Sequence, residues 1–157
     1  MKAFTIVAIL CLVSFTSRAQ NKLSDKIYWA ALDKYTLSLD SNKLKSANED
    51  KVKTIYLEKA NFIDSIPVAM NGYKIVAITS ENQWKLYKEH NKYLIHTIIF
   101  PVKISNNIAV ISFIPYHGKL KGRKHYYLGV SDGTNIHFKF DCNLKQFVFE
   151  RIENWGI

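Results

Sequence analysis

The sequence predicts an α+β fold in which an N-terminal helix and a second short helix pack on a curved antiparallel β-meander of about five strands. Three observations carry this prediction. Apolar residues recur at helical spacing near the start of the chain, and a helix-capping pattern occurs near its middle. From residue 94 onward, runs rich in Ile, Val, Phe and Tyr alternate with short turn sequences, which is typical of antiparallel strands.

The first 19 residues have the three-part pattern of a secretory signal peptide. Lys2 gives a basic start, an apolar run extends from Phe4 to Phe15, and the sequence SRA, ending at residue 19, is a small-x-small cleavage site. The apolar run is shorter than the ~18–20 residues needed to span a bilayer, which disfavours an uncleaved anchor. We therefore expect a signal peptide over 1–19 and a single α+β domain over 20–157. The domain would be periplasmic or secreted, with no transmembrane segment after signal removal.

The first helix is predicted over residues 24–39, where an apolar stripe recurs at i, i+3, i+4, i+7 and i+11. A short strand is predicted between Lys53 and Phe62. Asn71-Gly72 is a tight-turn sequence before a strand from Tyr73 to Ile78. The second helix is expected to begin at Ser80, with Gln83 completing a capping box, and to end near Asn91.

The remaining chain is predicted to form five successive antiparallel strands. They are separated by turns at Ser105-Asn106-Asn107, GKLKGRK, Asp132-Gly133 and NLKQ. A two-residue loop at Asp132-Gly133 would pair Tyr127 with Phe138 and Gly129 with Ile136. The last hairpin would pair Cys142 with Phe147, Phe140 with Phe149 and Lys139 with Glu150. One face would then carry Tyr127, Ile136, Phe138, Phe140, Cys142, Phe147 and Phe149.

Cys142 is the one cysteine expected in the mature chain, because Cys11 would leave with the signal peptide. The predicted pairing turns its thiol toward phenylalanine side chains, so we expect Cys142 to pack in the core. An interchain disulfide or a reactive thiol is the alternative.

This order of elements over residues 24–153 resembles the nuclear-transport-factor-2-like superfamily (NTF2-like, the cystatin-like cone). The tail FDCNLKQFVFERIENWGI, together with the signal sequence, also resembles small uncharacterised exported proteins of Gram-negative bacteria. The cone resemblance implies a pocket between a bent sheet and its helices. Many members bind small apolar ligands or dimerise, and a few are isomerases or dehydratases, so the resemblance does not choose a function.

The sequence contains none of the motifs that would indicate a metal site, a cofactor or a catalytic residue. Its five histidines lack the spacing of metal ligands, although His117 and His125 flank the GKLKGRK loop and could meet across it. His137 and Asp141 share a predicted strand face, but four strand residues separate them by about 13 Å, too far to hydrogen-bond.

The net charge of the chain is +9. Without Lys2 and Arg18 the mature chain keeps 20 of its 22 basic residues against 13 acidic ones, so its net charge is +7. Such a charge attracts anionic partners, and we expect no nucleic acid among them, because an exported protein rarely meets it. We expect an anionic envelope component, for example an acidic polysaccharide, lipid headgroups or an acidic protein. The alternative is that the charge serves solubility.

The densest cationic and aromatic sequence is KLKGRKHYY, which includes the candidate ligand-binding residues Lys121, Arg123, Lys124, His125 and Tyr127. Cations beside aromatic rings can bind phosphate or carboxylate groups and stack on a sugar. A solvated edge that discourages aggregation is the alternative. The predicted function is a non-catalytic domain that binds a small ligand or a partner, and a second copy of the chain is one candidate partner. The alternatives are a small cofactor-free enzyme using a pocket His, Asp or Tyr, and an envelope interaction protein using the basic hairpin.

Overall fold

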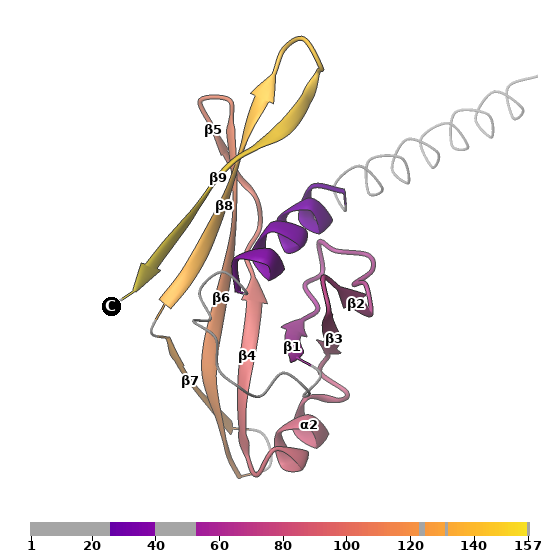
Figure 1. Cartoon of the computed structure of the whole chain (residues 1–157). Helices are drawn as coiled ribbons and strands as arrows, with labels where there is room; N and C mark the ends of the chain where they lie inside the picture. Colours follow the sequence, from indigo (N-terminus) through magenta and orange to yellow (C-terminus); the bar gives the residue numbers. More distant parts are fainter. Residues whose placement is uncertain (1–25, 40–52, 123–124, 131, 157) are drawn as a thin grey trace, which may run out of the picture.

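The computed structural model describes residues 26–39, 53–122, 125–130 and 132–156 (Figure 1). They form an N-terminal helix over residues 26–39, one further helix and a nine-stranded sheet. The labelled elements are β1 (Lys53–Glu58), β2 (Ala69–Met70), β3 (Tyr73–Ile78), α2 (Gln83–Glu89), β4 (Tyr93–Ile99), β5 (Lys103–Ser105), β6 (Ile108–Lys121), β7 (His125–Val130), β8 (Asp132–Asp141) and β9 (Gln146–Gly156). The predicted signal peptide lies outside the described residues.

The sheet is mixed, so the predicted α+β meander of about five antiparallel strands is wrong. The strand order is β2-β3-β1-β4-β6-β8-β9, with β5 and β7 also paired to β6. β1 runs parallel to both β3 and β4, whereas the pairs from β4 to β9 are antiparallel. The sequence between β3 and β4 contains α2 and carries the chain across β1. A central strand paired to two later strands leaves no local sequence signal, because parallel neighbours need a crossover rather than a turn.

The predicted hairpin at Asp132-Gly133 is also absent. β7 and β8 run in the same direction and pair with successive parts of β6, so Tyr127 lies opposite Lys119 and Phe138 opposite Ala109. Gly133 lies in β8, where its lack of a side chain makes room for Trp155. A Cβ atom at Gly133 would lie 2.3 Å from Cζ2 of Trp155, so the glycine lets the indole ring lie directly on the strand.

The last hairpin keeps its two strands but shifts by two residues. Phe140 pairs with Phe147, Phe138 with Phe149 and Lys139 with Val148. The Asp141 carboxylate decides the shift, because it accepts hydrogen bonds from the backbone N–H groups of Asn143 (2.8 Å) and Leu144 (3.0 Å). The turn therefore begins one residue after Asp141, and Cys142 is an exposed free thiol in it. The prediction that Cys142 packs in the core is wrong.

The N-terminal helix covers one face of the sheet, as its apolar stripe predicts. Tyr28, Ala31, Leu32 and Tyr35 are buried against the inward residues of β1, β3, β6 and β8. The Tyr35 ring stacks on Phe113 with a centroid separation of 4.4 Å. The helix and sheet thus pack directly together, and Phe113, Ile111 and Ile136 have no exposed surface.

Helix α2 covers the opposite face, at the end of the sheet where β4 begins (Figure 1). Its Tyr87 is fully buried among Ile78, Leu94 and Leu120, which alternate with the residues that face the N-terminal helix. The helix begins at Gln83 with Asn82 as its N-cap, so the predicted start at Ser80 is wrong. Asn82 instead accepts a 2.8 Å hydrogen bond from the Thr79 N–H and donates one to Ala77 O, which ties the helix start to β3.

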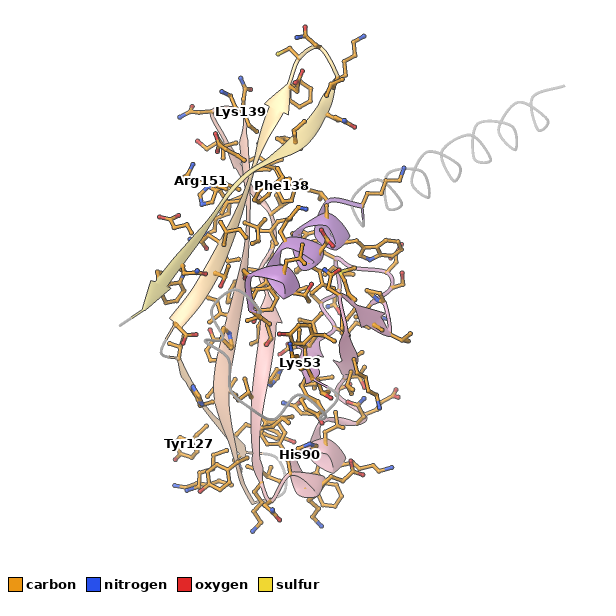
Figure 2. The ribbon with its side chains drawn as sticks, viewed as in Figure 1. Lys53, His90, Tyr127, Phe138, Lys139 and Arg151 are labelled. Atoms are coloured by element: carbon orange, nitrogen blue, oxygen red, sulfur yellow. The ribbon has the colours of Figure 1, made fainter. Side chains whose placement is uncertain are left out.

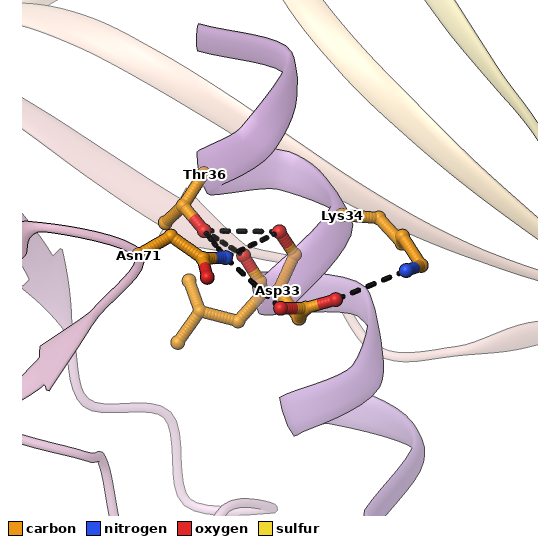
Figure 3. Close-up of polar contacts among 5 residues, drawn as sticks. Asp33, Lys34, Thr36 and Asn71 are labelled. Carbon is orange, nitrogen blue, oxygen red and sulfur yellow. Dashed lines mark hydrogen bonds and ion pairs between the residues drawn. The ribbon is translucent and has the colours of Figure 1, made fainter. Parts of the chain in front are cut away.

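Asn71 connects the β2–β3 turn to the N-terminal helix (Figure 3). Its amide donates 2.9 Å hydrogen bonds to Asp33 Oδ1 and Thr36 Oγ1. Asn71 and Gly72 have φ values of 48° and 78°, as the tight-turn prediction requires. The Asn71 hydrogen bond is the main reason that the pKa of Asp33 lies below its ordinary value of 3.8, assisted by Lys34 and opposed by partial burial.

We expect Asn71→Ala to lower the free energy of unfolding by roughly 1–2 kcal/mol, because it removes the hydrogen bonds of the Asn71 amide to Asp33 and Thr36 and places alanine in a left-handed conformation. Part of the loss should be pH-dependent. A lowered pKa in the folded state stabilises the protein above 3.8, and this contribution is lost as the pH falls through the lowered pKa. Urea unfolding at a series of pH values measures both effects. Asn71→Gly is the control, since it keeps the turn conformation and removes only the side chain. Equal stability of wild type and Asn71→Ala at neutral pH would contradict the assignment.

Candidate functional site

Three of the five predicted ligand-binding residues lie on the β6–β7 hairpin. Lys121 ends β6 and pairs with His125 at the start of β7, and Tyr127 lies opposite Lys119. Arg123 and Lys124 lie outside the described residues. His117 pairs with Gly129 rather than approaching His125, so the two histidines do not meet across the hairpin.

The register of three strands brings further residues to this site. Tyr93 of β4, Lys119 of β6 and Tyr127 of β7 are directly opposite one another, so they form one row on one face. The next row contains Ile95, His117 and Gly129. We call this surface the basic aromatic face, and it consists of Tyr93, Ile95, His117, Lys119, Lys121, His125 and Tyr127.

The basic aromatic face is open to solvent. Tyr93 and Tyr127 are each 58% exposed, and Ile95 is 56% exposed. It lies on the same side of the sheet as the N-terminal helix but at the other end of the long strands, where Figure 2 shows Tyr127 at the lower edge of the sheet. Two exposed tyrosines beside an exposed isoleucine indicate a recognition surface rather than core packing.

Each tyrosine of the face has a lysine ammonium over its ring. Lys119 Nζ lies 5.0 Å from the Tyr93 ring centroid, and Lys121 Nζ lies 4.4 Å from that of Tyr127. Lys121 Nζ also donates a 3.4 Å hydrogen bond to the Tyr127 hydroxyl. The sequences of β4, β6 and β7 contain no Asp or Glu, so no carboxylate from these strands neutralises the two ammonium groups.

Beside the tyrosine row the surface is hollowed. An open depression of about 390 Å³ is lined by Tyr93, Leu94, Ile95, His117, Gly118 and Lys119. On the neighbouring strand Gly129 has open space above it, since only the His117 carbonyl oxygen, at 4.0 Å, would approach a Cβ atom there. The face can therefore accept a bulky group beside its tyrosine row.

Sequence reasoning missed Tyr93 and Ile95, which come from a strand far from the predicted hairpin tip. Their alternation with Leu94 and His96 in β4 was the available signal, because residues at i and i+2 share a strand face. This signal places Tyr93 and Ile95 at the site only once β4 is known to pair with the C-terminal part of β6.

A second candidate functional site is the open cleft of about 560 Å³ at the carboxyl ends of β1 and β3. Its lining is mainly polar and includes Glu58, Lys59, Asp64, Ser80 and Gln83. Behind Glu58 lies the buried His96, whose Nε2 is 2.8 Å from Glu58 Oε2. The carboxylate is close to Nε2 but is not aligned with the N–H direction as a hydrogen bond requires. On its other side, His96 Nδ1 is 3.4 Å from the Tyr87 hydroxyl.

The surroundings of His96 suit a structural role. Burial lowers the pKa of His96, and the Glu58 charge opposes this shift. Burial also raises the pKa of Tyr87 to about 12, with Tyr126 and Glu58 contributing in the same direction. Since His96 is 1% exposed and does not line the cleft, its imidazole cannot touch a molecule bound there. The cleft therefore offers the carboxylates of Glu58 and Asp64, but His96 supplies no acid or base to it.

His90 and His137 have local partners. His90 donates from Nδ1 to Leu86 O at 2.9 Å and accepts at Nε2 from the Tyr56 hydroxyl at 2.7 Å. His137 contacts Glu153 Oε2 at 2.9 Å, which is the main cause of the lowered pKa of Glu153. Within the described ranges, no three His, Cys, Asp or Glu side chains are grouped as metal ligands would be. Neither described helix is long and apolar enough to cross a bilayer.

Comparison of the chain with protein-family models, curated proteins and solved structures gives no match. The resemblance to the nuclear-transport-factor-2-like superfamily therefore stays a prediction. The class of protein must be inferred from the site itself.

Proposed function

We propose that this chain is a non-catalytic binding domain that holds an anionic partner on the basic aromatic face. The observation that carries the proposal is the row Tyr93–Lys119–Tyr127, in which exposed rings and ammonium groups come from three strands without a single acidic residue. A rigid sheet is a suitable support for such a surface, because its side chains are fixed by strand pairing rather than by a loop.

The rest of the molecule supports binding over catalysis. The space between the N-terminal helix and the sheet is filled by Tyr35, Leu32 and Phe113, which leaves those positions for packing rather than for a ligand. The histidine nearest the polar cleft is buried behind Glu58. The signal-peptide pattern of the sequence supports a partner in the cell envelope or outside the cell.

The double variant Lys119→Glu with Lys121→Glu should lose most of its affinity for an anionic polymer. Both ammonium groups are exposed on strands without acidic residues, and reversal replaces attraction by repulsion. The experiment measures retention of the full-length mature protein on heparin-agarose across a salt gradient, where fewer charge contacts mean elution at lower salt.

The control is Lys74→Glu with Lys103→Glu, which changes the net charge equally at two exposed positions on β3 and β5. If both double variants elute at the same reduced salt concentration, net charge alone explains retention and the proposed site is wrong.

A further inference from the structure

The two tyrosines of the basic aromatic face form a repeated arrangement across the sheet. Tyr93 and Tyr127 are two strands apart in one row, with Lys119 between them. Neighbouring strands are about 4.8 Å apart, so the two tyrosine backbones are separated by roughly 10 Å. Each ring has its own ammonium group, from Lys119 and Lys121 respectively. The face thus repeats one ring and one positive charge across the sheet.

A flexible anion such as polyphosphate would use the lysines but leave the rings without a function. A lipid surface would need aliphatic side chains to insert among the acyl chains, and Ile95 is the one exposed aliphatic side chain among the described residues of this face. Leu128 and Val130 point to the other side of the sheet, because they alternate with Tyr127 along β7. The exposed rings and charges together require a ligand that carries both flat apolar surfaces and anionic groups.

We propose that the basic aromatic face binds a carboxylated polysaccharide, with Tyr93 and Tyr127 stacking on sugar rings and Lys119 and Lys121 holding the carboxylates. This proposal rests on the proposed function and names the ligand class of the same site. In a polymer of sugar acids every unit supplies a ring face and one carboxylate, which matches the pairing of each tyrosine with one ammonium group. The depression beside Tyr93, lined by Ile95 and His117, gives room for a pyranose ring.

The test is calorimetric titration of the full-length mature protein with short oligogalacturonate chains. Methyl-esterified chains of equal length keep the rings and remove the charge. Polyphosphate, single-stranded DNA and phosphatidylserine vesicles supply charge without sugar-acid rings. We expect oligogalacturonate to bind most tightly of these probes and its methyl ester at least ~10-fold more weakly, the equivalent of ~1.4 kcal/mol.

The decisive variant is Tyr93→Ala with Tyr127→Ala. It should weaken oligogalacturonate binding by roughly 10-fold or more while changing polyphosphate binding by less than about 2-fold, because only the sugar uses the rings. Trp84→Ala is the matched control, since Trp84 is another exposed aromatic residue with a lysine ammonium 4.0 Å above its ring, but it lies on α2.

The outcomes separate the two proposals. If the tyrosine variant binds oligogalacturonate as wild type does while the lysine variant loses binding, the sugar assignment is overturned and anion binding stands. Tighter binding of polyphosphate, DNA or vesicles than of oligogalacturonate would also overturn the sugar assignment. If wild type binds none of these probes, both the ligand class and the proposed function are wrong.

Discussion

Phe113→Ala is expected to lower the free energy of unfolding by about 3–5 kcal/mol, the largest effect of any substitution proposed for this chain. Phe113 has no exposed surface, and its ring is the contact on which Tyr35 of the N-terminal helix stacks. Alanine would leave a cavity between helix and sheet and remove the aromatic pair. Since whole domains are stable by only about 5–15 kcal/mol, the variant should also melt about 6–20 °C lower.

The matched control is Tyr127→Ala, which removes an aromatic side chain from the same sheet at an exposed position. It should change the free energy of unfolding by less than about 0.5 kcal/mol. Guanidinium unfolding monitored by far-ultraviolet circular dichroism compares the two variants. Equal stabilities would mean that the helix does not pack on Phe113.

Gly118→Ala is expected to have the second largest effect. It should lower the free energy of unfolding by roughly 2–3 kcal/mol, the upper part of the range for overpacking. A Cβ atom at Gly118 would lie 1.8 Å from the Tyr87 hydroxyl oxygen and 2.7 Å from Cζ of the ring. Tyr87 is fully buried, so its ring can move away only by displacing α2 from the sheet. The glycine is thus required by the close approach of a helix residue to the strand.

A double-mutant cycle tests this cause. In a Tyr87→Leu background the added methyl group meets no ring, so Gly118→Ala should cost less than about 0.5 kcal/mol there. Gly129→Ala on the neighbouring strand is the glycine control, because its Cβ atom would enter open space. A cost for Gly118→Ala that is unchanged by Tyr87→Leu would show that the clash is not responsible.

Local patterns in the sequence predicted several elements correctly. The helical stripe around Tyr35, the strand from Tyr73 to Ile78 and the turn at Asn71-Gly72 all depend on residues close together in the chain. Their signals are the spacing of apolar side chains and the backbone freedom of particular turn residues. Such signals do not require knowledge of the partner strand.

The predictions that failed depend on contacts between distant residues. Asp132-Gly133 has the sequence of a hairpin turn, but both residues belong to the start of β8 and the glycine accommodates Trp155. Lys139 and Glu150 have opposite charges and suggested that they pair. The hydrogen bonds of the Asp141 carboxylate instead fix a turn that pairs Lys139 with Val148, a register shifted by two residues. In both cases tertiary packing or a side-chain hydrogen bond outweighs the preference that the local sequence suggests.

Part of the candidate site could be predicted, namely the residues that are close together in the sequence. Lys121, His125 and Tyr127 are close in sequence and formed a visible cluster. Tyr93 joins them because β4 pairs with β6 near its end, and only the register reveals this. The site is therefore a property of the sheet rather than of the hairpin tip alone.

The position of the N-terminal helix has a consequence for how the protein is made. The ribosome synthesises this helix before the sheet, and some of the strand residues that bury its apolar stripe, Phe113, Ile136 and Phe138, are among the later parts of the chain. The burial of the stripe, which β1 and β3 can begin, is therefore complete only when β6 and β8 have emerged. A chain whose core is complete only after its last third is translated cannot finish folding early in its synthesis, which is compatible with the export that the sequence predicts.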